Sequence, residues 1–247
     1  STILSIKMST SDLKNFVLVH GTSHGGWCWK RVVHLLHLAG HRVYTPTLTG
    51  CGERSHLTNT GINLDTHITD VVNVIKWEEL EEVVLCGHSY GGWVISGVVE
   101  QLLGRINTII FLDAFMPKDG QRGFDLQSPE SQKAVLRAME SGHISRPPGS
   151  IERYKLNARD QKWVESMLTP QPIGVSLQPI KLTGAREKVK NKAYILATKY
   201  NNPPFVDCYR KLKDNPLWQV YALHCGHNVM LDMPKELTEI LLQVAKA

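Results

Sequence analysis

The sequence predicts an α/β fold built on a doubly wound, mostly parallel sheet. Short apolar runs alternate with stretches of helical periodicity along most of the 247 residues. This alternation is typical of parallel sheets, because each connection between parallel strands crosses over through a helix. The length fits one domain, 1–247. The predicted strands are 15–20, 41–46, 82–87, 108–113, 192–198 and 218–223.

The first predicted strand is wholly apolar at 16–19, which is typical of a strand buried on both faces of a parallel sheet. In such sheets a ligand site lies beyond the carboxyl ends of the strands. The predicted helices are 27–38, 66–75, 92–103 and 234–244, with another around Asp207.

The regular alternation breaks between 118 and 190, after the fourth predicted strand. Pro, Gly, Ser and Gln are frequent there, and only short helical stretches occur, at 128–139 and 160–168. Long interruptions of this kind in a compact domain are usually functional. We therefore predict a small helical cap at 118–190, inserted into the domain and lying over the site.

The composition excludes several classes of protein. The net charge is +5, but the basic residues are scattered among 23 acidic ones and form no basic run, so no nucleic-acid partner is expected. The five cysteines have no CxxC or zinc-site spacing, which favours free thiols in a reducing compartment. With no apolar run of 18 residues and no signal-peptide pattern, we expect a cytoplasmic protein without a membrane span. The oligomeric state stays open, with a homodimer among the alternatives.

The motif Gly-His-Ser-Tyr-Gly at 87–91 stands directly between a predicted strand and a predicted helix. Strand, sharp turn and helix are the context of a nucleophile elbow. Such a turn strains the serine backbone, while its glycines let neighbouring backbone pass close by. We predict Ser89 as a nucleophile; the alternative is a Gly-rich turn with an idle serine.

A serine hydroxyl needs a base to become nucleophilic. His227 follows the last predicted strand and precedes the final helix, so its loop opens at the same edge of the sheet as Ser89. A neutral imidazole there can take the serine proton and pass it to the leaving group. His224 and His88 are the weaker candidates, and activity should fall below about pH 6.5 as the base protonates.

The acid that orients the histidine has two candidates. The fifth predicted strand runs into 198–204 without a carboxylate, whereas Asp113 directly follows the fourth strand. A carboxylate among apolar neighbours is costly unless it has a partner. We favour Asp113, with Asp207 and a purely structural Asp113 as alternatives.

The Gly-rich loop 20–26 follows the first strand and lies beside the predicted elbow. Acyl transfer needs two N–H donors for the oxyanion, each contributing roughly 3–4 kcal/mol. The amides of Thr22 and Tyr90 are the natural pair. The chain has neither of the phosphate-binding glycine motifs, and no metal or organic cofactor is required for this chemistry.

With these residues assembled, the chain resembles the α/β-hydrolase superfamily over almost its whole length, which implies the α/β-hydrolase fold. More narrowly, it is similar to the small esterases of the methyl-ester-esterase and hydroxynitrile-lyase group and to their bacterial carboxylesterase relatives. The segments that carry the resemblance are 16–21, 24–29, 40–43, 87–92, 111–117, 168–172 and 226–230.

Two departures from this group bear on mechanism. Plant members usually keep an acid after the penultimate strand, and this chain lacks it. The Leu-Asp-Ala-Phe-Met-Pro segment resembles the segment from which some haloalkane dehalogenases supply their catalytic acid, which supports Asp113. Dehalogenase chemistry is disfavoured, because those enzymes need a carboxylate where this chain has Ser89. Similar hydroxynitrile lyases use a lysine after the catalytic histidine and a threonine in the first loop. Here Asn228 and Gly21 stand near those places, which disfavours lyase activity.

The sequence thus predicts a serine carboxylesterase that acts through an acyl-enzyme on a small to medium apolar ester. The alternatives are a lyase of the hydroxynitrile type and a non-catalytic small-ligand receptor on the same fold. The residues expected to contact the substrate are His24, Met116, Trp163, Met167 and Leu168. For the aromatic and methionine residues among them, the equal alternative is that they form the core of the cap.

Overall fold

The computed structural model describes residues 12–246, and the predicted absence of a signal peptide concerns a segment outside that range. A central sheet of six parallel strands has the order β2-β1-β3-β4-β7-β8. This confirms the predicted parallel, doubly wound sheet. The strands are β1 Asn15–Val19, β2 Arg42–Tyr44, β3 Val83–His88, β4 Ile106–Leu112, β7 Asn191–Ala197 and β8 Trp218–Leu223.

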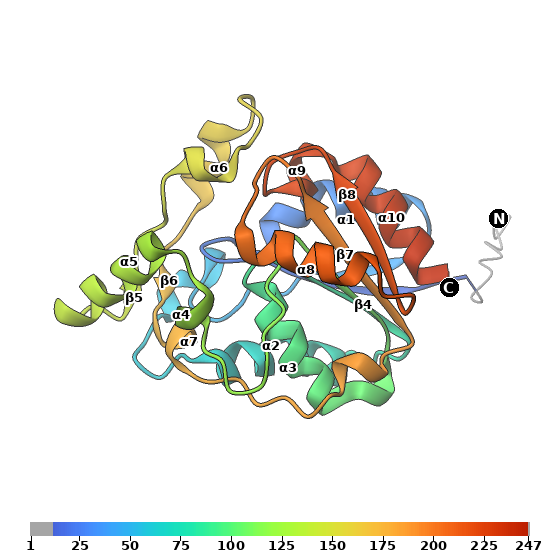
Figure 1. Ribbon diagram of the computed structural model, residues 1–247, viewed down its shortest axis with the longest axis horizontal. Helices are drawn as coiled ribbons and strands as arrows, with labels where there is room; N and C mark the ends of the chain where they lie inside the picture. Colours follow the sequence, from blue (N-terminus) through green and yellow to red (C-terminus); the bar gives the residue numbers. More distant parts are fainter. Residues whose placement is uncertain (1–11, 247) are drawn as a thin grey trace, which may run out of the picture.

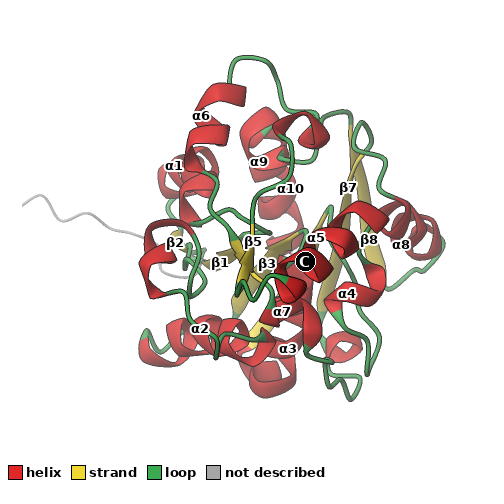
Figure 2. Ribbon diagram, turned by 90° about the vertical axis from the view of Figure 1, so that its left-hand side faces the viewer, coloured by secondary structure: helices red, strands yellow, loops and turns green. Residues whose placement is uncertain are grey.

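Helices cover both faces of the sheet (Figures 1 and 2). On one face α2 packs against α3, and on the other α1 packs against α10. Successive residues of β3 enter opposite cores: Val83 and Leu85 pack on the α2–α3 side, Val84 and Cys86 on the α1–α10 side. These helices are α1 Lys30–Leu38, α2 Leu64–Trp77, α3 Gly91–Leu102, α8 Pro203–Lys213, α9 Val229–Asp232 and α10 Pro234–Lys246.

The segment between β4 and β7 leaves the sheet and returns to it, and its short elements lie on the left of Figure 1. The predicted helices 128–139 and 160–168 correspond to α5 and α6. A small core of its own includes Val135, Ala138 and Ile173. The elements are α4 Gly123–Leu126, α5 Pro129–Glu140, β5 Ser145–Arg146, α6 Gln161–Met167, β6 Gln171–Pro172 and α7 Gly174–Leu177.

Some predicted helix boundaries differ from the structure. The predicted helix 27–38 is a 3-10 turn, Gly26–Trp29, followed by α1. Helix α2 begins before its predicted start, because the Asn63 side chain accepts from the Thr66 amide and forms a capping box. The other 3-10 turns are Gly52–Leu57, Leu103–Arg105, Ile151–Tyr154 and Arg186–Lys188. None of the helices within 12–246 is long and apolar enough to cross a membrane.

Candidate active site

Ser89 occupies the turn between β3 and α3 in a left-handed conformation, with φ of 56°. Such a backbone costs a non-glycine residue about 1–3 kcal/mol and persists only where the surroundings impose it. The flanking glycines make the turn possible: a Cβ on Gly87 would lie 2.6 Å from the Gly91 carbonyl oxygen, and one on Gly91 would lie 2.7 Å from that of Val19. The geometry is that of a nucleophile elbow.

His227 and Asp113 meet at the carboxyl edge of the sheet. The Nδ1 of His227 lies 2.6 Å from Oδ2 of Asp113. The other carboxylate oxygen of Asp113 accepts from the Ala197 amide at the end of β7, at 2.9 Å. Both side chains are buried. The competing acid, Asp207, is exposed on α8 and forms no ion pair with His227.

The partners of His227 fix its tautomer. Because Nδ1 donates to Asp113, Nε2 is left as an acceptor, and no described residue forms a hydrogen bond with it. Burial lowers the pKa of His227 well below its usual value, with further lowering by nearby His24 and Arg153. Burial also raises the pKa of Asp113, opposed by the Ala197 N–H. A neutral imidazole with a free Nε2 is the form that a general base needs.

Stacking holds the imidazole in its plane. The ring of Tyr200 lies 4.1 Å from that of His227, with an interplanar angle of 20°. The ring of Phe205, from α8, stacks at 5.8 Å. The His227 amide donates to the Tyr154 carbonyl at 2.8 Å, so the segment between β4 and β7 also holds the histidine loop.

The two rival histidines have other roles. His88 donates through Nε2 to the His227 carbonyl at 2.7 Å and so supports the backbone of the histidine loop. Burial lowers its pKa well below the usual value, with His227 and His24 adding to the effect. His224 is exposed, forms a hydrogen bond with Thr198 and does not line the cavity at Ser89.

Thr22 and Tyr90 line the same cavity as Ser89. Neither of their amides donates a hydrogen bond to another of the residues in 12–246, so both are available to an oxyanion. His24 secures the loop, donating through Nδ1 to the Thr22 carbonyl at 2.7 Å and accepting at Nε2 from the Asn228 side chain at 2.9 Å. His24 thus joins the first loop to the histidine loop.

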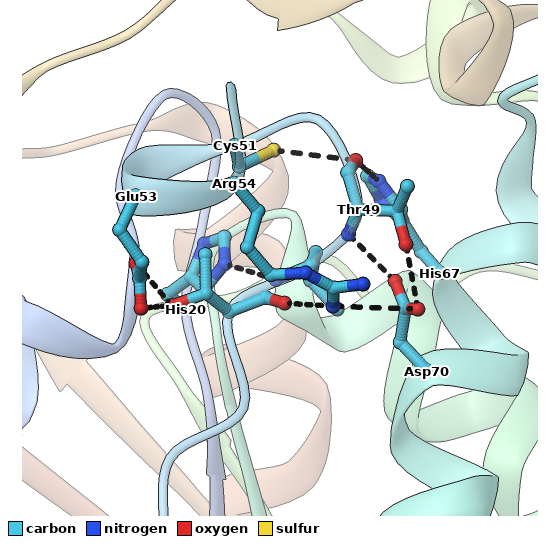
Figure 3. Close-up of polar contacts among 9 residues, drawn as sticks. His20, Thr49, Cys51, Glu53, Arg54, His67 and Asp70 are labelled. Carbon is cyan, nitrogen blue, oxygen red and sulfur yellow. Dashed lines mark hydrogen bonds and ion pairs between the residues drawn. The ribbon is translucent and has the colours of Figure 1, made fainter. Parts of the chain in front are cut away.

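A buried polar network, which no sequence pattern predicts, supports the elbow from the other side. The Tyr90 hydroxyl donates to Nδ1 of His67 at 2.8 Å, and Nε2 of His67 donates to the Thr49 carbonyl at 2.8 Å. The Asp70 carboxylate accepts hydrogen bonds from both the amide and the hydroxyl of Thr49, and Nη1 of Arg54 lies 3.7 Å from Oδ1 of Asp70 (Figure 3). The only signal in the sequence is the Gly-punctuated loop 48–57.

The predicted substrate contacts need correction. His24 reaches the cavity, but both of its ring nitrogens are already bonded. Met116, Trp163, Met167 and Leu168 do not line it. Trp163 packs edge-on against Trp27 at 5.5 Å, and Met167 borders a separate hollow beside Trp27. Leu168 packs on the α1–α10 core and Met116 on the α2–α3 core. Helix α6 therefore turns its apolar side chains toward the main domain and away from Ser89.

The cavity, of about 80 Å³, has an apolar part and a polar part. No described group of three or more His, Cys, Asp or Glu side chains is placed to hold a metal ion. The apolar and aromatic lining comprises Trp93, Phe115, Tyr154, Val175, Tyr200 and Phe205, and the polar lining includes Gln127, Ser128, Ser131, Arg146, Arg153, Gln171, Ser176 and Asn202.

A family model described as "Alpha/beta hydrolase family" matches residues 16–240. The chain belongs to this family. The hydrolase is 40% identical over 239 residues to a protein of Nocardioides sp. (strain SG-4G) named carbendazim hydrolyzing esterase, covering 93% of this chain and 98% of that protein. It is 36% identical over 265 residues to methylesterase 10 of Arabidopsis thaliana, covering 96% and 94%. These relatives confirm the expected enzyme class, a hydrolase of carboxylic esters.

Solved structures of lower identity support the fold of this hydrolase. An extracellular α/β-hydrolase from a Paenibacillus species superposes with a TM-score of 0.80 at 24% identity, covering 95% of this chain and 100% of that chain. Tomato methylketone synthase I complexed with 2-tridecanone superposes with a TM-score of 0.74 at 22% identity, covering 94% and 98%. At these identities the likeness concerns the fold alone.

Proposed function

We propose that this hydrolase cleaves carboxylic esters through an acyl-enzyme on Ser89. The observation that carries the proposal is the contact of 2.6 Å between His227 and Asp113, in a cavity that His227 shares with the strained Ser89. A base oriented by an acid, in one cavity with a half-buried serine at a nucleophile elbow, is the arrangement of nucleophilic acyl transfer.

The first half of the reaction forms the acyl-enzyme. Nε2 of His227 takes the proton of Ser89 Oγ as Oγ attacks the ester carbonyl carbon, and the Thr22 and Tyr90 amides stabilise the oxyanion. The protonated imidazole then gives its proton to the departing alcohol as the C–O bond breaks. Asp113 holds the tautomer and stabilises the transient imidazolium.

The second half regenerates the enzyme. Water loses a proton to Nε2 of His227 and attacks the acyl carbon. The carboxylic acid leaves as Ser89 Oγ recovers the proton from His227. No step needs a metal or an organic cofactor.

The cavity favours a small to medium ester with an apolar portion. Phe115, Val175 and Phe205 provide apolar contacts beside Ser89. The relatives named as methylesterases support a small alcohol as the leaving group. Because the relatives' names point to several esters, the proposal extends to the ester class and not to one compound.

Replacing the nucleophile tests the mechanism. The substitution Ser89→Ala should lower the kcat for a neutral p-nitrophenyl ester by about 10⁶-fold, because the whole nucleophilic path is lost. The wild type, but not this variant, should gain the mass of a fluorophosphonate adduct. Ser166→Ala, at an exposed serine of α6, is the matched control. Unchanged turnover in Ser89→Ala would refute the mechanism, and ligand binding by a wild type without turnover would favour the receptor alternative.

A further inference from the structure

One wall of the active-site cavity carries a positive charge without a counter-charge. Arg146, at the end of β5, lines the cavity and is only 7% exposed. Its Nε is buried without a hydrogen-bond partner, and among residues 12–246 no side chain or carbonyl accepts from its guanidinium. Burial lowers the pKa of Arg146, which is the expected effect on a charge that lacks compensation. A buried ion of this kind is costly unless a partner of opposite charge arrives.

A second arginine lines the same cavity. Arg153 lines the cavity, and the carboxylate nearest to it is that of Glu130, 3.8 Å away with its side chain 71% exposed. So exposed a pair contributes little. The charge of Arg153 also acts on the catalytic end of the cavity, where it adds to the effect of burial in lowering the pKa of His227.

Acidic side chains are missing from the cavity wall as far as the structure describes it. No Asp or Glu in 12–246 lines it. Asp113 is engaged by His227 and by the Ala197 amide. The cavity therefore offers two cations, and a bound ligand must bring the anion.

We propose that Arg146 and Arg153 form an anion subsite that binds an ionised carboxylate of the substrate. This inference rests on the proposed ester hydrolysis at Ser89. The planar guanidinium fork matches a carboxylate, with two parallel N–H donors for its two oxygens. The substrate class is then the half-esters of dicarboxylic acids: the free carboxylate binds at Arg146, the ester carbonyl lies at Ser89, and the chain between them contacts Phe115 and Phe205.

A matched pair of substrates tests the subsite in the wild type. Monomethyl glutarate carries a free carboxylate, and methyl glutaramate replaces it by an uncharged amide of similar size. Methanol release at neutral pH should give a kcat/KM about 10- to 100-fold higher for the half-ester, as charge-assisted hydrogen bonds provide. Equal values, or a preference for the amide, would overturn the proposal.

Variants locate the effect. Arg146→Met should reduce the preference to within about threefold by lowering kcat/KM for the half-ester alone, and Arg146→Lys, which keeps the charge, should restore part of it. Arg137→Met is the matched control, because Arg137 is exposed on α5 and should leave the preference intact. An equal loss on both substrates in Arg146→Met would assign Arg146 a structural role. If Arg146→Met fails to fold, the substrate pair and Arg146→Lys still decide.

Binding separates a failed subsite from a failed mechanism. Titration of monomethyl glutarate into Ser89→Ala measures the subsite without turnover, with methyl glutaramate as the uncharged comparison. Tighter binding of the half-ester by about 10-fold or more supports the subsite even if no ester is hydrolysed. Hydrolysis of p-nitrophenyl esters that depends on Ser89, together with equal binding of the two ligands, would refute the subsite and leave the proposed mechanism standing.

Discussion

The carboxyl edge of the sheet and the segment 118–190 contribute different things to one cavity. Ser89, Asp113 and His227 follow the ends of β3, β4 and β8, where parallel strands bring their termini together. The segment 118–190 adds Arg146 and Arg153, and neither belongs to a long element. The sheet edge thus carries the proposed catalytic residues, whereas the inserted segment supplies the two arginines of the proposed anion subsite.

After loss of the nucleophile itself, the largest effect should come from the acid at the sheet edge. Asp113→Asn should lower kcat by about 10⁴-fold, because the amide no longer favours the tautomer that leaves Nε2 free to accept. Asp207→Asn, at an exposed position of α8, should stay within about twofold of the wild type. Steady-state kinetics on a neutral ester measures both. A crippled Asp207→Asn beside an active Asp113→Asn would reverse the assignment of the acid.

The sheet edge could be predicted from the sequence because each of its residues adjoins a strong local pattern. Ser89 lies between an apolar strand and a helix, and Asp113 directly follows another apolar strand. Parallel strands then bring such positions together without further information. The support from His67 could not be predicted in the same way, because its contact with Tyr90 joins residues 23 apart through a buried side-chain network.

The residues of the inserted segment that line the cavity could not be predicted from the sequence, for a physical reason. Its helices are short, and an apolar residue on a short helix can face either the cavity or the main domain. Trp163 and Met167 were predicted to contact substrate, yet they pack near Trp27. The residues that do line the cavity, Arg146 and Arg153, carry charges whose burial depends on tertiary packing. Hydrophobic periodicity cannot report that burial.

Acid should destabilise the protein, because the histidines buried around the carboxyl edge of the sheet are neutral. Burial lowers the pKa of His20 to about 3 and that of His24 to about 4. In the unfolded chain both bind protons near pH 6.5, so their contribution to stability is present above that pH and is lost as the pH falls toward their folded values. Together they should lower the free energy of unfolding by about 2.4 kcal/mol as the pH falls from about 6 to 5.

Other buried groups modify this slope without reversing it. Burial also lowers the pKa values of His67, His88 and His227, so these histidines steepen the loss of unfolding free energy as the pH falls. The raised pKa of Asp113 acts in the opposite direction, but it is one group against several. Urea unfolding at several pH values measures the slope. His143→Gln, at an exposed position of the inserted segment, should leave it unchanged. A free energy of unfolding that is constant from pH 7.5 to 5 would contradict the neutral, buried state of these histidines.

Alanine substitutions at two glycines, one in each region, should differ in how much unfolding free energy they cost. In Gly91→Ala the new methyl group meets the Val19 carbonyl oxygen at 2.7 Å, and that backbone lies in the central sheet. The overpacking should cost about 1–3 kcal/mol of unfolding free energy. In Gly149→Ala the nearest atom, also at 2.7 Å, is the end of the flexible Arg153 side chain, so the cost should stay below about 1 kcal/mol. Chemical denaturation compares them, and equal losses would show that the inserted segment is as tightly packed as the sheet edge.

The smallest effect tests whether the two regions are electrically coupled. Burial lowers the pKa of His227, and the charges of His24 and Arg153 add to that lowering. The acid limb of kcat/KM for a neutral ester should therefore lie below about pH 6.5, which corrects the value expected for an ordinary histidine. In Arg153→Met one cause of the lowering is removed, and the limb should move to higher pH, by less than about one unit across a partly solvated cavity. Arg137→Met, which removes an exposed charge of α5, should leave the limb in place. If the acid limb shifts equally in both variants, the shift comes from the net charge of the protein. If the limb does not move in Arg153→Met, the charge of Arg153 does not act on His227, and the inserted segment acts on the substrate alone.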